Sequence, residues 1–215
     1  MEQCLKKPGA SPQASPYFQY GPREIVHLKG KDKRLGAAIE EIGIIRRPII
    51  PNPFTALISS IVSQQISKKA AATVWGRLSE LLGSITPETI QGTDLAAIRA
   101  CGMSTRKATY IKDIAQAALS GQVDFASLHT LEDQEIIARL SALPGVGVWT
   151  AEMLLIFSLN RLNVLSYNDL AIRRGIMKLY GHKELPRSRF ERYRTRYSPY
   201  CSVASLYLWE ISGQD

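Results

Sequence analysis

The chain contains 215 residues, of which 45% are hydrophobic and 21% are charged, and these values are typical of a globular protein that buries a sizeable core. It has no apolar run of the roughly 18 residues that a membrane span requires, and its N-terminus lacks the apolar segment of a signal peptide. Three widely spaced cysteines, Cys4, Cys101 and Cys201, favour a reducing cytoplasm and provide neither a disulfide framework nor a four-cysteine metal site. We therefore expect a cytoplasmic protein of one domain or two packed lobes, without contact with a membrane.

Basic residues outnumber acidic ones, which gives a formal net charge of +8 and a pI of about 9.5. Residues 1–50 carry nine lysines and arginines against five acidic residues, and residues 160–215 carry ten against five, whereas the middle of the chain is nearly neutral. A basic surplus favours a polyanionic partner such as a nucleic acid, although a solvated face is the commoner explanation for any single basic run. Charge alone leaves both interpretations open.

The N-terminal part of the chain predicts one helix and little other regular structure. Residues 1–16 are rich in proline, serine and lysine, which indicates a loose tail, and Tyr17 to Leu28 has the weak extended character of a short strand or arm. Asp32 to Gly43 is the first predicted helix, because a glycine readily adopts the backbone conformation that ends a helix. Residues 44–53 are proline-rich, and residues before proline avoid the helical region, so we expect an irregular connection there.

Two helices with an amide-rich junction are predicted next. Phe54 to Val62 is apolar, and Ser67 to Leu82 has an alanine-rich face with a glycine after it. Between them, Gln64 and Gln65 are consecutive amides flanked by apolar residues. Considered by themselves, such amides are ordinary residues of a helix surface.

A short turn in the middle of the chain leads into a helix that begins with two cations. The turn is Cys101 to Ser104, and Ser104 is the predicted N-cap of the helix from Thr105 to Leu119. Arg106 and Lys107 lie in the first turn of this helix. They are either two solvated cations or a grip on a phosphate group of a nucleic acid.

The stretch from Leu143 to Ala151 organises the chain, because Gly145 and Gly147 lie one residue apart between two predicted helices. These helices are Glu135 to Leu140 and Trp149 to Leu159. Glycines permit a tight turn and the close approach of another backbone, and the N–H groups at the start of the second helix can bind an anion such as a DNA phosphate. A turn that serves packing alone is an equally good interpretation of the short motif.

The C-terminal part predicts three further helices, which are Asp169 to Tyr180, Arg187 to Arg196 with five arginines, and the aromatic-rich Ser202 to Ser212. Asp169 lies at the start of its helix, where an aspartate most often serves only as a cap. With some ten helices, and without a convincing alternating strand pattern or an internal repeat, the sequence predicts an all-α fold.

Six stretches of the sequence carry a family resemblance, and they follow one another in the family's order. The stretches are Pro53 to Trp75, Gly102 to Ala108, Leu143 to Ala151, Asp169 to Gly175, Tyr197 to Tyr200, and Leu208 with Trp209. Together they resemble the helix-hairpin-helix DNA glycosylase superfamily, and within it the DNA-3-methyladenine glycosylase II type. In that superfamily the hairpin grips the DNA backbone, and an aspartate at the start of a later helix is catalytic. The resemblance extends from about Asp32 to about Gly213.

The resemblance implies a two-lobed, all-α helix-hairpin-helix fold, without the N-terminal β-rich domain that glycosylases of the subfamily often carry. The expected parts are a tail or arm (residues 1–30), a terminal lobe of two segments (residues 31–53 plus 164–215) and a central lobe (residues 54–163). The helix-hairpin-helix lies inside the central lobe, at about residues 135–158. The active cleft would lie between the lobes, with Asp169 facing the hairpin.

Asp169 is the expected catalytic residue. Cleavage of an N-glycosidic bond builds oxocarbenium-like positive charge on the sugar, and a nearby carboxylate stabilises this charge and can orient or deprotonate a water molecule. The base must first leave the stack, which costs a few kcal/mol and requires a side chain that fills the gap; the resemblance assigns this role to Gln65, with Ile66 next to it. The lyase-active branch has a lysine two residues beyond the second hairpin glycine, where this chain has Trp149. We therefore expect a monofunctional enzyme.

The resemblance also assigns residues to a pocket for the damaged base. Trp149 and Trp209 align with pocket aromatics, although a single tryptophan in a helix is usually a core residue. A base methylated on a ring nitrogen carries positive charge, and aromatic faces attract it by roughly 0.5 to 2 kcal/mol. The other expected pocket residues are Met153, Leu170 and Tyr200. Met153 and Leu170 stand where relatives can have tyrosines, and Cys201 stands where an arginine is frequent, which leaves the substrate range open.

The sequence thus predicts a monofunctional DNA glycosylase that flips and excises alkylated bases, of the 3-methyladenine and 7-methylguanine class, from duplex DNA in base excision repair. One alternative is a glycosylase for a deaminated or oxidised base, and the absence of the lyase lysine weakens the version for oxidised guanine. Another is a helix-hairpin-helix protein that binds DNA without catalysis. The joint presence of Asp169, Gln65 and Trp209 argues against it.

The expected DNA contacts lie at the hairpin, at the amide-rich junction and at the turn before Arg106. They are Gln65, Ile66, Ser67, Gly145, Val146, Gly147, Thr150, Ser104, Arg106 and Lys107. The resemblance further implies a structural monovalent cation, Na⁺ or K⁺, on the backbone carbonyls of Ser141, Leu143 and Val146. We expect no required cofactor, no iron–sulfur cluster, a monomer bound to double-stranded DNA, and a place in the cytoplasm, on the nucleoid if the source is bacterial.

Overall fold

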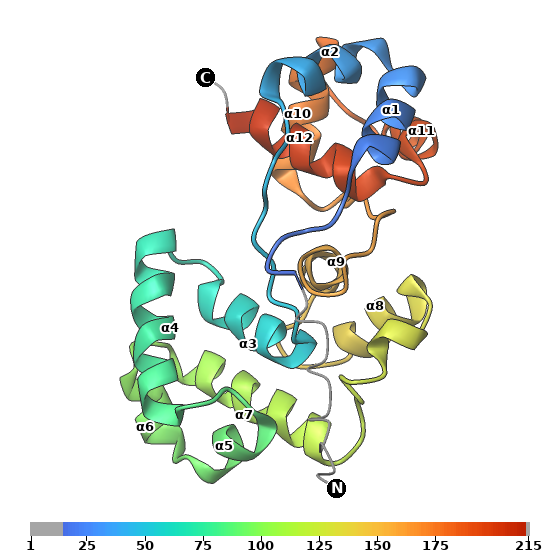
Figure 1. Cartoon of the computed structure of the whole chain (residues 1–215). Coiled ribbons are helices and arrows are strands. Elements are labelled where there is room, and N and C mark those ends of the chain that lie inside the picture. The colour runs from blue at the N-terminus through green and yellow to red at the C-terminus, as the bar shows by residue number, and fades with distance from the viewer. Residues whose placement is uncertain (1–14, 214–215) are drawn as a thin grey trace, which may run out of the picture.

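Helices make up the secondary structure of the chain in the computed structural model, which describes residues 15–213 (Figure 1). In this range the helices are α1 (Pro22–Lys31), α2 (Lys33–Ile42), α3 (Pro53–Ser63), α4 (Lys68–Leu82), α5 (Pro87–Gly92), α6 (Leu95–Ala100), α7 (Thr105–Leu119), the 3₁₀ helix η1 (Leu128–Thr130), α8 (Asp133–Ser141), α9 (Val148–Phe157), α10 (Leu170–Tyr180), α11 (Arg187–Tyr197) and α12 (Cys201–Gly213). Within residues 15–213, pairing of the strand type is limited to one bridge between Tyr17 and Pro48. The predicted all-α fold is confirmed. Over the same range, none of the helices combines the length and the apolar character that crossing a membrane requires.

The N-terminal arm contains a helix that the sequence pattern does not predict. The prediction of extended structure for Tyr17 to Leu28 is wrong for residues 22–28, which form most of α1. The chain enters α1 through Gly21, whose backbone N–H donates to the Glu24 carboxylate at 2.8 Å, and Pro22 supplies a helical φ at the first position. These local signals outweigh the weak extended character of the stretch.

Short polar side chains set the starts of the helices that position the site. A helix leaves its first N–H groups without intrahelical partners, and a serine or aspartate at the N-cap accepts a hydrogen bond from one or two of them. The caps of this kind are Asp32 for α2, Ser67 for α4, Ser104 for α7 and Asp169 for α10. The predicted starts of these helices are confirmed to within one residue.

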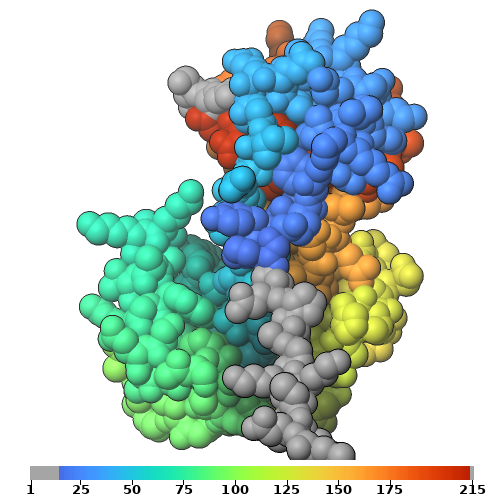
Figure 2. Space-filling model, in the orientation of Figure 1, coloured from blue at the N-terminus to red at the C-terminus, as the bar shows by residue number. Residues whose placement is uncertain are grey.

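The helices form two groups on either side of α9 (Figure 1). α1, α2, α10, α11 and α12 contact one another in one group, here called the terminal lobe because it combines both ends of the described chain. α3 to α8 form the other group, here called the central lobe. α9 packs against α3 and α8. In the space-filling view, the outline of the molecule is indented between α4 and the terminal lobe (Figure 2).

Close backbone packing and a buried polar group hold the terminal lobe together. An ideal Cβ on Gly175 of α10 would lie 2.2 Å from the carbonyl oxygen of Leu208 on α12, so only glycine allows these two backbones to be this close. The buried Asp32 carboxylate accepts hydrogen bonds from the Tyr180 hydroxyl at 2.6 Å and from the Arg196 guanidinium at 2.7 Å. These contacts join α2 to α10 and α11 and so fix the direction of α10, which begins at the predicted catalytic residue.

Three segments of the chain cross between the lobes, and hydrogen bonds join them to one another and to α9 (Figure 1). The segments are residues 15–21, 43–52 and 158–169. The Phe18 N–H donates to the Arg47 carbonyl at 2.8 Å, and the Ile50 N–H donates to the Phe157 carbonyl at 2.9 Å. Similar bonds join Ile49 to Pro16 and the backbone of Gln19 to the Asn160 amide. The connection between the lobes is therefore a braced set of segments.

Candidate active site and DNA-binding surface

The hairpin between α8 and α9 presents backbone N–H groups that suit an anion. α9 begins at Val148, after Gly147 as its N-cap. Glycine has no side chain that can accept from the first N–H groups, so these groups are available at the positive end of the helix dipole. The buried side chains of Leu143 and Val146 anchor the turn, and the Val146 N–H donates to the Leu143 carbonyl at 3.2 Å. The predicted hairpin residues thus lie together in a geometry that suits a phosphate group.

Gly145 is required by its conformation and by its neighbour. Its φ is +78°, and an ideal Cβ would lie 2.3 Å from the ring of Tyr110 on α7. Any other residue would therefore need both a strained backbone and a displaced ring. Gly147 differs, because an ideal Cβ at this position meets no heavy atom of residues 15–213 within 4 Å. A side chain at position 147 has room in front of the helix terminus.

Asp169 and Trp149 form a pair that joins the starts of α9 and α10. Asp169 is 6% exposed, and its Oδ1 accepts the Ile172 N–H at 2.9 Å, as an N-cap does. Its Oδ2 accepts the Trp149 indole N–H at 2.9 Å. Both carboxylate oxygens therefore have a fixed partner, and the carboxylate is held at the N-terminal ends of two helices, where the dipoles favour a negative charge. The structure places the predicted catalytic residue beside the hairpin helix.

Glu152 is a buried carboxylate near Asp169 that was not among the site residues expected from the sequence. It lies one turn after Trp149 on α9, it is 9% exposed, and it accepts a hydrogen bond from the Ser166 hydroxyl. Burial raises the pKa of Glu152; the Ser166 hydrogen bond and the nearby arginines oppose this, and the charge of Asp169 adds to it. An acidic residue inside an otherwise apolar helix was the available signal, because such a residue needs a partner when it is buried. Glu152 braces the loop that leads to Asp169.

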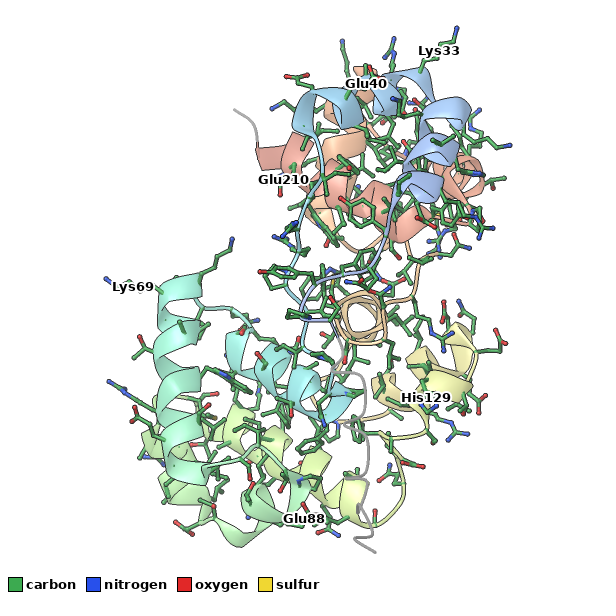
Figure 3. All side chains as sticks on the ribbon, in the orientation of Figure 1. Lys33, Glu40, Lys69, Glu88, His129 and Glu210 are labelled. Atoms are coloured by element: carbon green, nitrogen blue, oxygen red, sulfur yellow. The ribbon has the colours of Figure 1, made fainter. Side chains whose placement is uncertain are left out.

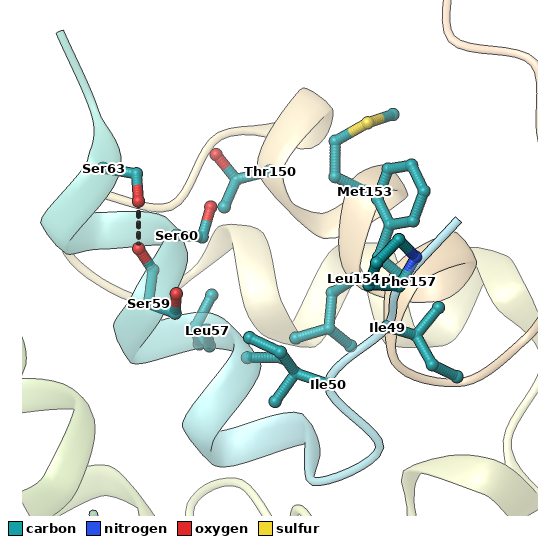
Figure 4. Close-up of a pocket in the computed structure, with 12 residues that line it drawn as sticks. Ile49, Ile50, Leu57, Ser59, Ser60, Ser63, Thr150, Met153, Leu154 and Phe157 are labelled. Atoms are coloured by element: carbon teal, nitrogen blue, oxygen red, sulfur yellow. Dashed lines mark hydrogen bonds between the residues drawn. The ribbon is translucent and has the colours of Figure 1, made fainter. Parts of the chain in front are cut away.

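A cavity of about 200 Å³ lies between α3, α9 and the segment from Pro48 to Ile50 (Figure 4). The hydroxyl-bearing residues Ser59, Ser60, Ser63 and Thr150 lie toward one end of it, and Met153, Leu154 and Phe157 lie toward the other. The Ser63 hydroxyl donates to the Ser59 carbonyl at 2.8 Å. The cavity therefore has hydrogen-bonding groups at one end and soft apolar groups at the other, which is the usual composition of a small-molecule pocket.

The predicted pocket aromatics lie in different surroundings. Trp149 is 41% exposed and lines a neighbouring cavity of about 330 Å³ together with Ser60, Ser63, Gln64 and Gln65. Trp209 packs against the Phe157 ring with centroids 5.4 Å apart, and the Arg47 guanidinium lies 5.7 Å from the Phe157 centroid and 5.9 Å from the Trp209 centroid. The ring at the edge of the first cavity is therefore that of Phe157, with Trp209 packed against it. Neither Phe157 nor Arg47 was expected in the site from the sequence.

Of the other predicted pocket residues, only one lines the first cavity. Met153 lines the first cavity, as a pocket residue would. Leu170 is 54% exposed at the start of α10, directly after Asp169. Tyr200 is buried in the terminal lobe, where its ring meets the His27 ring edge-on at 5.0 Å. Tyr200 thus has a packing role in this structure.

The junction between α3 and α4 carries the predicted gap-filling residues on its surface. Gln65 is exposed with φ +57°, Ile66 is 41% exposed, and Ser67 caps α4. The Gln64 amide donates to the Gly145 carbonyl at 3.0 Å, so this junction touches the hairpin. Lys69 projects outward from the start of α4 (Figure 3). Positive charge therefore lies close to the exposed junction.

The side chains of three predicted DNA contacts are bonded or buried within the protein. The Lys107 ammonium donates to the Val62 and Gln64 carbonyls. Thr150 is 4% exposed and lines the first cavity, and the Val146 side chain is buried. Arg106, by contrast, is exposed at the start of α7. Of the two cations at this turn, Arg106 is the one placed to meet a phosphate.

Comparisons with known proteins agree with this arrangement. Residues 58–199 match the family described as HhH-GPD superfamily base excision DNA repair protein. The chain is 36% identical over 199 residues to DNA-3-methyladenine glycosylase 1 of Schizosaccharomyces pombe, covering 87% of this chain and 86% of the relative.

Two solved structures extend the agreement to the fold. The crystal structure of a DNA-3-methyladenine glycosidase from Bacillus halodurans superposes with a TM-score of 0.82 at 40% identity, covering 92% of this chain and 93% of that one. The S. pombe 3-methyladenine DNA glycosylase Mag1 in complex with abasic DNA superposes with a TM-score of 0.75 at 34% identity, covering 87% and 95%. With the hairpin, the aspartate and the helical fold in place, the chain belongs to the HhH-GPD superfamily of base excision DNA repair proteins.

Proposed function

We propose that the protein is a monofunctional DNA-3-methyladenine glycosylase that removes alkylated bases from duplex DNA. The observation that carries the proposal is the Asp169 carboxylate, held by the Trp149 indole and by the start of α10, next to the anion-binding hairpin. The relatives named above are similar over most of their length and act on 3-methyladenine by name. A protein that only binds DNA would need the hairpin but would not need a second hydrogen bond from the Trp149 indole to the Asp169 carboxylate.

The proposed reaction is hydrolysis of the N-glycosidic bond. As the bond between the sugar and the base breaks, positive charge develops on the sugar, and the Asp169 carboxylate stabilises it. The base leaves with the electron pair of the glycosidic bond, which neutralises the charge of a methylated ring. Water attacks the sugar carbon and gives one proton to the Asp169 carboxylate or to solvent, so the products are the free base and an abasic site. Trp149 occupies the position of the lysine in the lyase-active branch, so an amine for a Schiff base is missing at this position. A methylated base is a good leaving group because its ring already carries positive charge.

The extruded base has a candidate pocket in the cavity between α3 and α9. Removing a base from the stack costs a few kcal/mol, and the enzyme recovers this cost by filling the gap and by binding the base. We propose that Gln65 fills the gap in the stack and that the cavity lined by Met153 and Phe157 binds the extruded base. The Phe157 ring at the edge of the cavity would attract a cationic base, and the serine hydroxyls would accept or donate hydrogen bonds at its polar edge.

We also propose that the hairpin holds a monovalent cation next to the DNA phosphate that it would bind. Its donors would be the backbone carbonyls of Ser141, Leu143 and Val146, and hard alkali cations prefer oxygen ligands of this kind. The buried Ser141 hydroxyl has no hydrogen-bond partner among the described residues, which supports an ion near this residue. The ion would contribute positive charge next to the phosphate. We propose that the enzyme otherwise needs no cofactor, and that it acts as a monomer in the cytoplasm.

Release of a methylated base tests the proposed function. The purified protein should liberate 3-methyladenine from methylated DNA without added metal or nucleotide. Abasic sites should accumulate, and strand breaks should appear only after alkali or heat. A panel of duplexes, each with 7-methylguanine, hypoxanthine, 8-oxoguanine or no lesion, establishes the substrate range. Activity on hypoxanthine or 8-oxoguanine alone, or borohydride trapping of a protein–DNA adduct, would contradict the proposal.

The hairpin assignment predicts the effect of Gly147→Asp. The new carboxylate fits the open space in front of α9, where it would repel a phosphate and occupy the free N–H groups itself. Affinity should fall about tenfold or more for damaged and undamaged duplexes alike, as for the loss of a charge-assisted contact. Fluorescence anisotropy with both duplexes measures this, with Gly147→Ala as the matched control. Normal binding of both duplexes by the Gly147→Asp variant would remove the hairpin from the DNA interface.

A further inference from the structure

The junction between α3 and α4 holds an exposed residue in a strained conformation. Gln65 has φ +57°, a left-handed backbone that residues other than glycine seldom adopt. Such a conformation persists only where the surroundings hold it. The Gln65 side chain is exposed, so the support must come from the neighbouring backbone. The contacts of this backbone identify two residues that provide the support.

Lys107 binds the end of α3. Its ammonium lies on α7 and donates to the Val62 carbonyl at 2.8 Å and to the Gln64 carbonyl, directly before Gln65. The last carbonyls of a helix lack intrahelical partners and form the negative end of its dipole, which makes an ammonium a suitable partner. Partial burial lowers the pKa of Lys107. Its charge is thus committed to the protein interior at the base of the junction.

Gln64 connects the same junction to the hairpin. Its amide donates to the Gly145 carbonyl at 3.0 Å. On the other side, Gly145 faces the ring of Tyr110, which lies one turn after Lys107 on α7. One face of α7 therefore supports both the junction and the hairpin, and the Gln64 amide joins the two.

We infer that Lys107 and Gln64 are positioning residues, which hold the gap-filling junction at a fixed place relative to the phosphate-binding hairpin before DNA arrives. The inference rests on the proposed base-flipping function. A junction that is already ordered loses little conformational entropy when it enters the stack, so more of the binding energy remains to offset unstacking. Neither residue touches the reacting atoms; both act through the placement of Gln65.

The experiment compares Lys107→Met and Gln64→Leu with Arg106→Met. Methionine keeps much of the lysine stem without the charge, and Arg106 is the exposed cation next to Lys107. Three quantities are measured for each variant: single-turnover base release, affinity for an undamaged duplex at several salt concentrations, and fluorescence of 2-aminopurine placed beside a tetrahydrofuran abasic analogue. The last quantity reports unstacking without any catalysis.

The positioning role predicts a selective loss. Lys107→Met and Gln64→Leu should each lower base release and the fluorescence gain about tenfold, the scale of losing a charged or buried hydrogen bond. Affinity for the undamaged duplex should stay within about twofold. The double variant should lose less than the product of the single effects, because both residues hold one junction. Lys107→Arg, which keeps charge and donors, should recover most of the loss.

Two outcomes would overturn the inference. Release and fluorescence within twofold of the wild type in both variants would show that the junction does not need this support. A weaker affinity for undamaged DNA with a salt slope reduced by about one, as expected for Arg106→Met, would mark Lys107 as a direct phosphate contact. If the wild-type protein releases no methylated base, the proposed function fails, and the fluorescence measurement still decides the role of both residues.

Discussion

Asp169→Asn should lower the single-turnover rate of base release by about 100-fold or more, the scale of losing a charge-stabilising or acid/base group. Asparagine has nearly the same shape, but it carries no charge to stabilise the developing cation on the sugar. It also offers a single oxygen acceptor, so it can bind the Ile172 N–H or the Trp149 indole but not both. Binding of an abasic-analogue duplex should change much less than the rate, because the hairpin is unchanged.

Trp149→Phe is the matched comparison for this variant. It removes the indole N–H that binds the Asp169 Oδ2 and keeps an aromatic ring and the carboxylate. We expect a rate between those of the wild type and Asp169→Asn, since the charge remains while one restraint on it is lost. If the Asp169→Asn variant released the base at the wild-type single-turnover rate, Asp169 would serve only as a helix cap.

Gly175→Ala should destabilise the fold by about 3 kcal/mol, the upper part of the usual range for overpacking a core. The added methyl group would lie 2.2 Å from the Leu208 carbonyl oxygen, and this neighbour is backbone, which cannot rotate away as a side chain can. α10 and α12 would have to separate. The higher helix propensity of alanine offsets only about 0.5 to 1 kcal/mol of this loss in stability. Urea unfolding at constant pH gives the free energy of unfolding directly.

Gly76 supplies the matched control. It lies within α4, it is exposed, and an ideal Cβ there meets no described heavy atom within 4 Å apart from the neighbouring backbone of its own helix. Gly76→Ala should therefore stabilise the protein by about 0.5 to 1 kcal/mol through helix propensity alone. Equal unfolding free energies for the two alanine variants would show that α10 and α12 move apart without cost.

Helix starts were predictable because their signals are local. Ser104 and Asp169 lie next to the N–H groups that they accept from, so the residue type in the sequence is enough to place the cap. The start of α1 has equally local signals in Gly21, Pro22 and Glu24, although the stretch that contains it has a weak extended character. The fold class followed from the sum of such signals.

The details of the site depend on contacts between distant residues, which no local pattern contains. The sequence identifies Asp169, whereas its bond to Trp149 joins residues that only the packing of α9 and α10 brings together. In the sequence, Lys107 resembles any exposed cation in the first turn of a helix. Only the fold shows that it binds the end of α3. The sequence also does not show that Trp149 and Trp209 lie in different surroundings, because the position of Trp209 depends on how α12 packs against Phe157.

The braced segments between the lobes have a consequence for how damage is found. A clamp that closes on its target needs a hinge, and here a hinge motion would break bonds such as those from Phe18 to Arg47 and from Ile50 to Phe157. While these bonds are kept, the distortion that carries a base out of the stack must be made in the duplex. Bending DNA costs on the order of a few kcal/mol, and the cost is smallest where pairing and stacking are already weak. A stiff protein therefore selects for base pairs that are easily opened and unstacked, and selects against base pairs that are firmly paired and stacked.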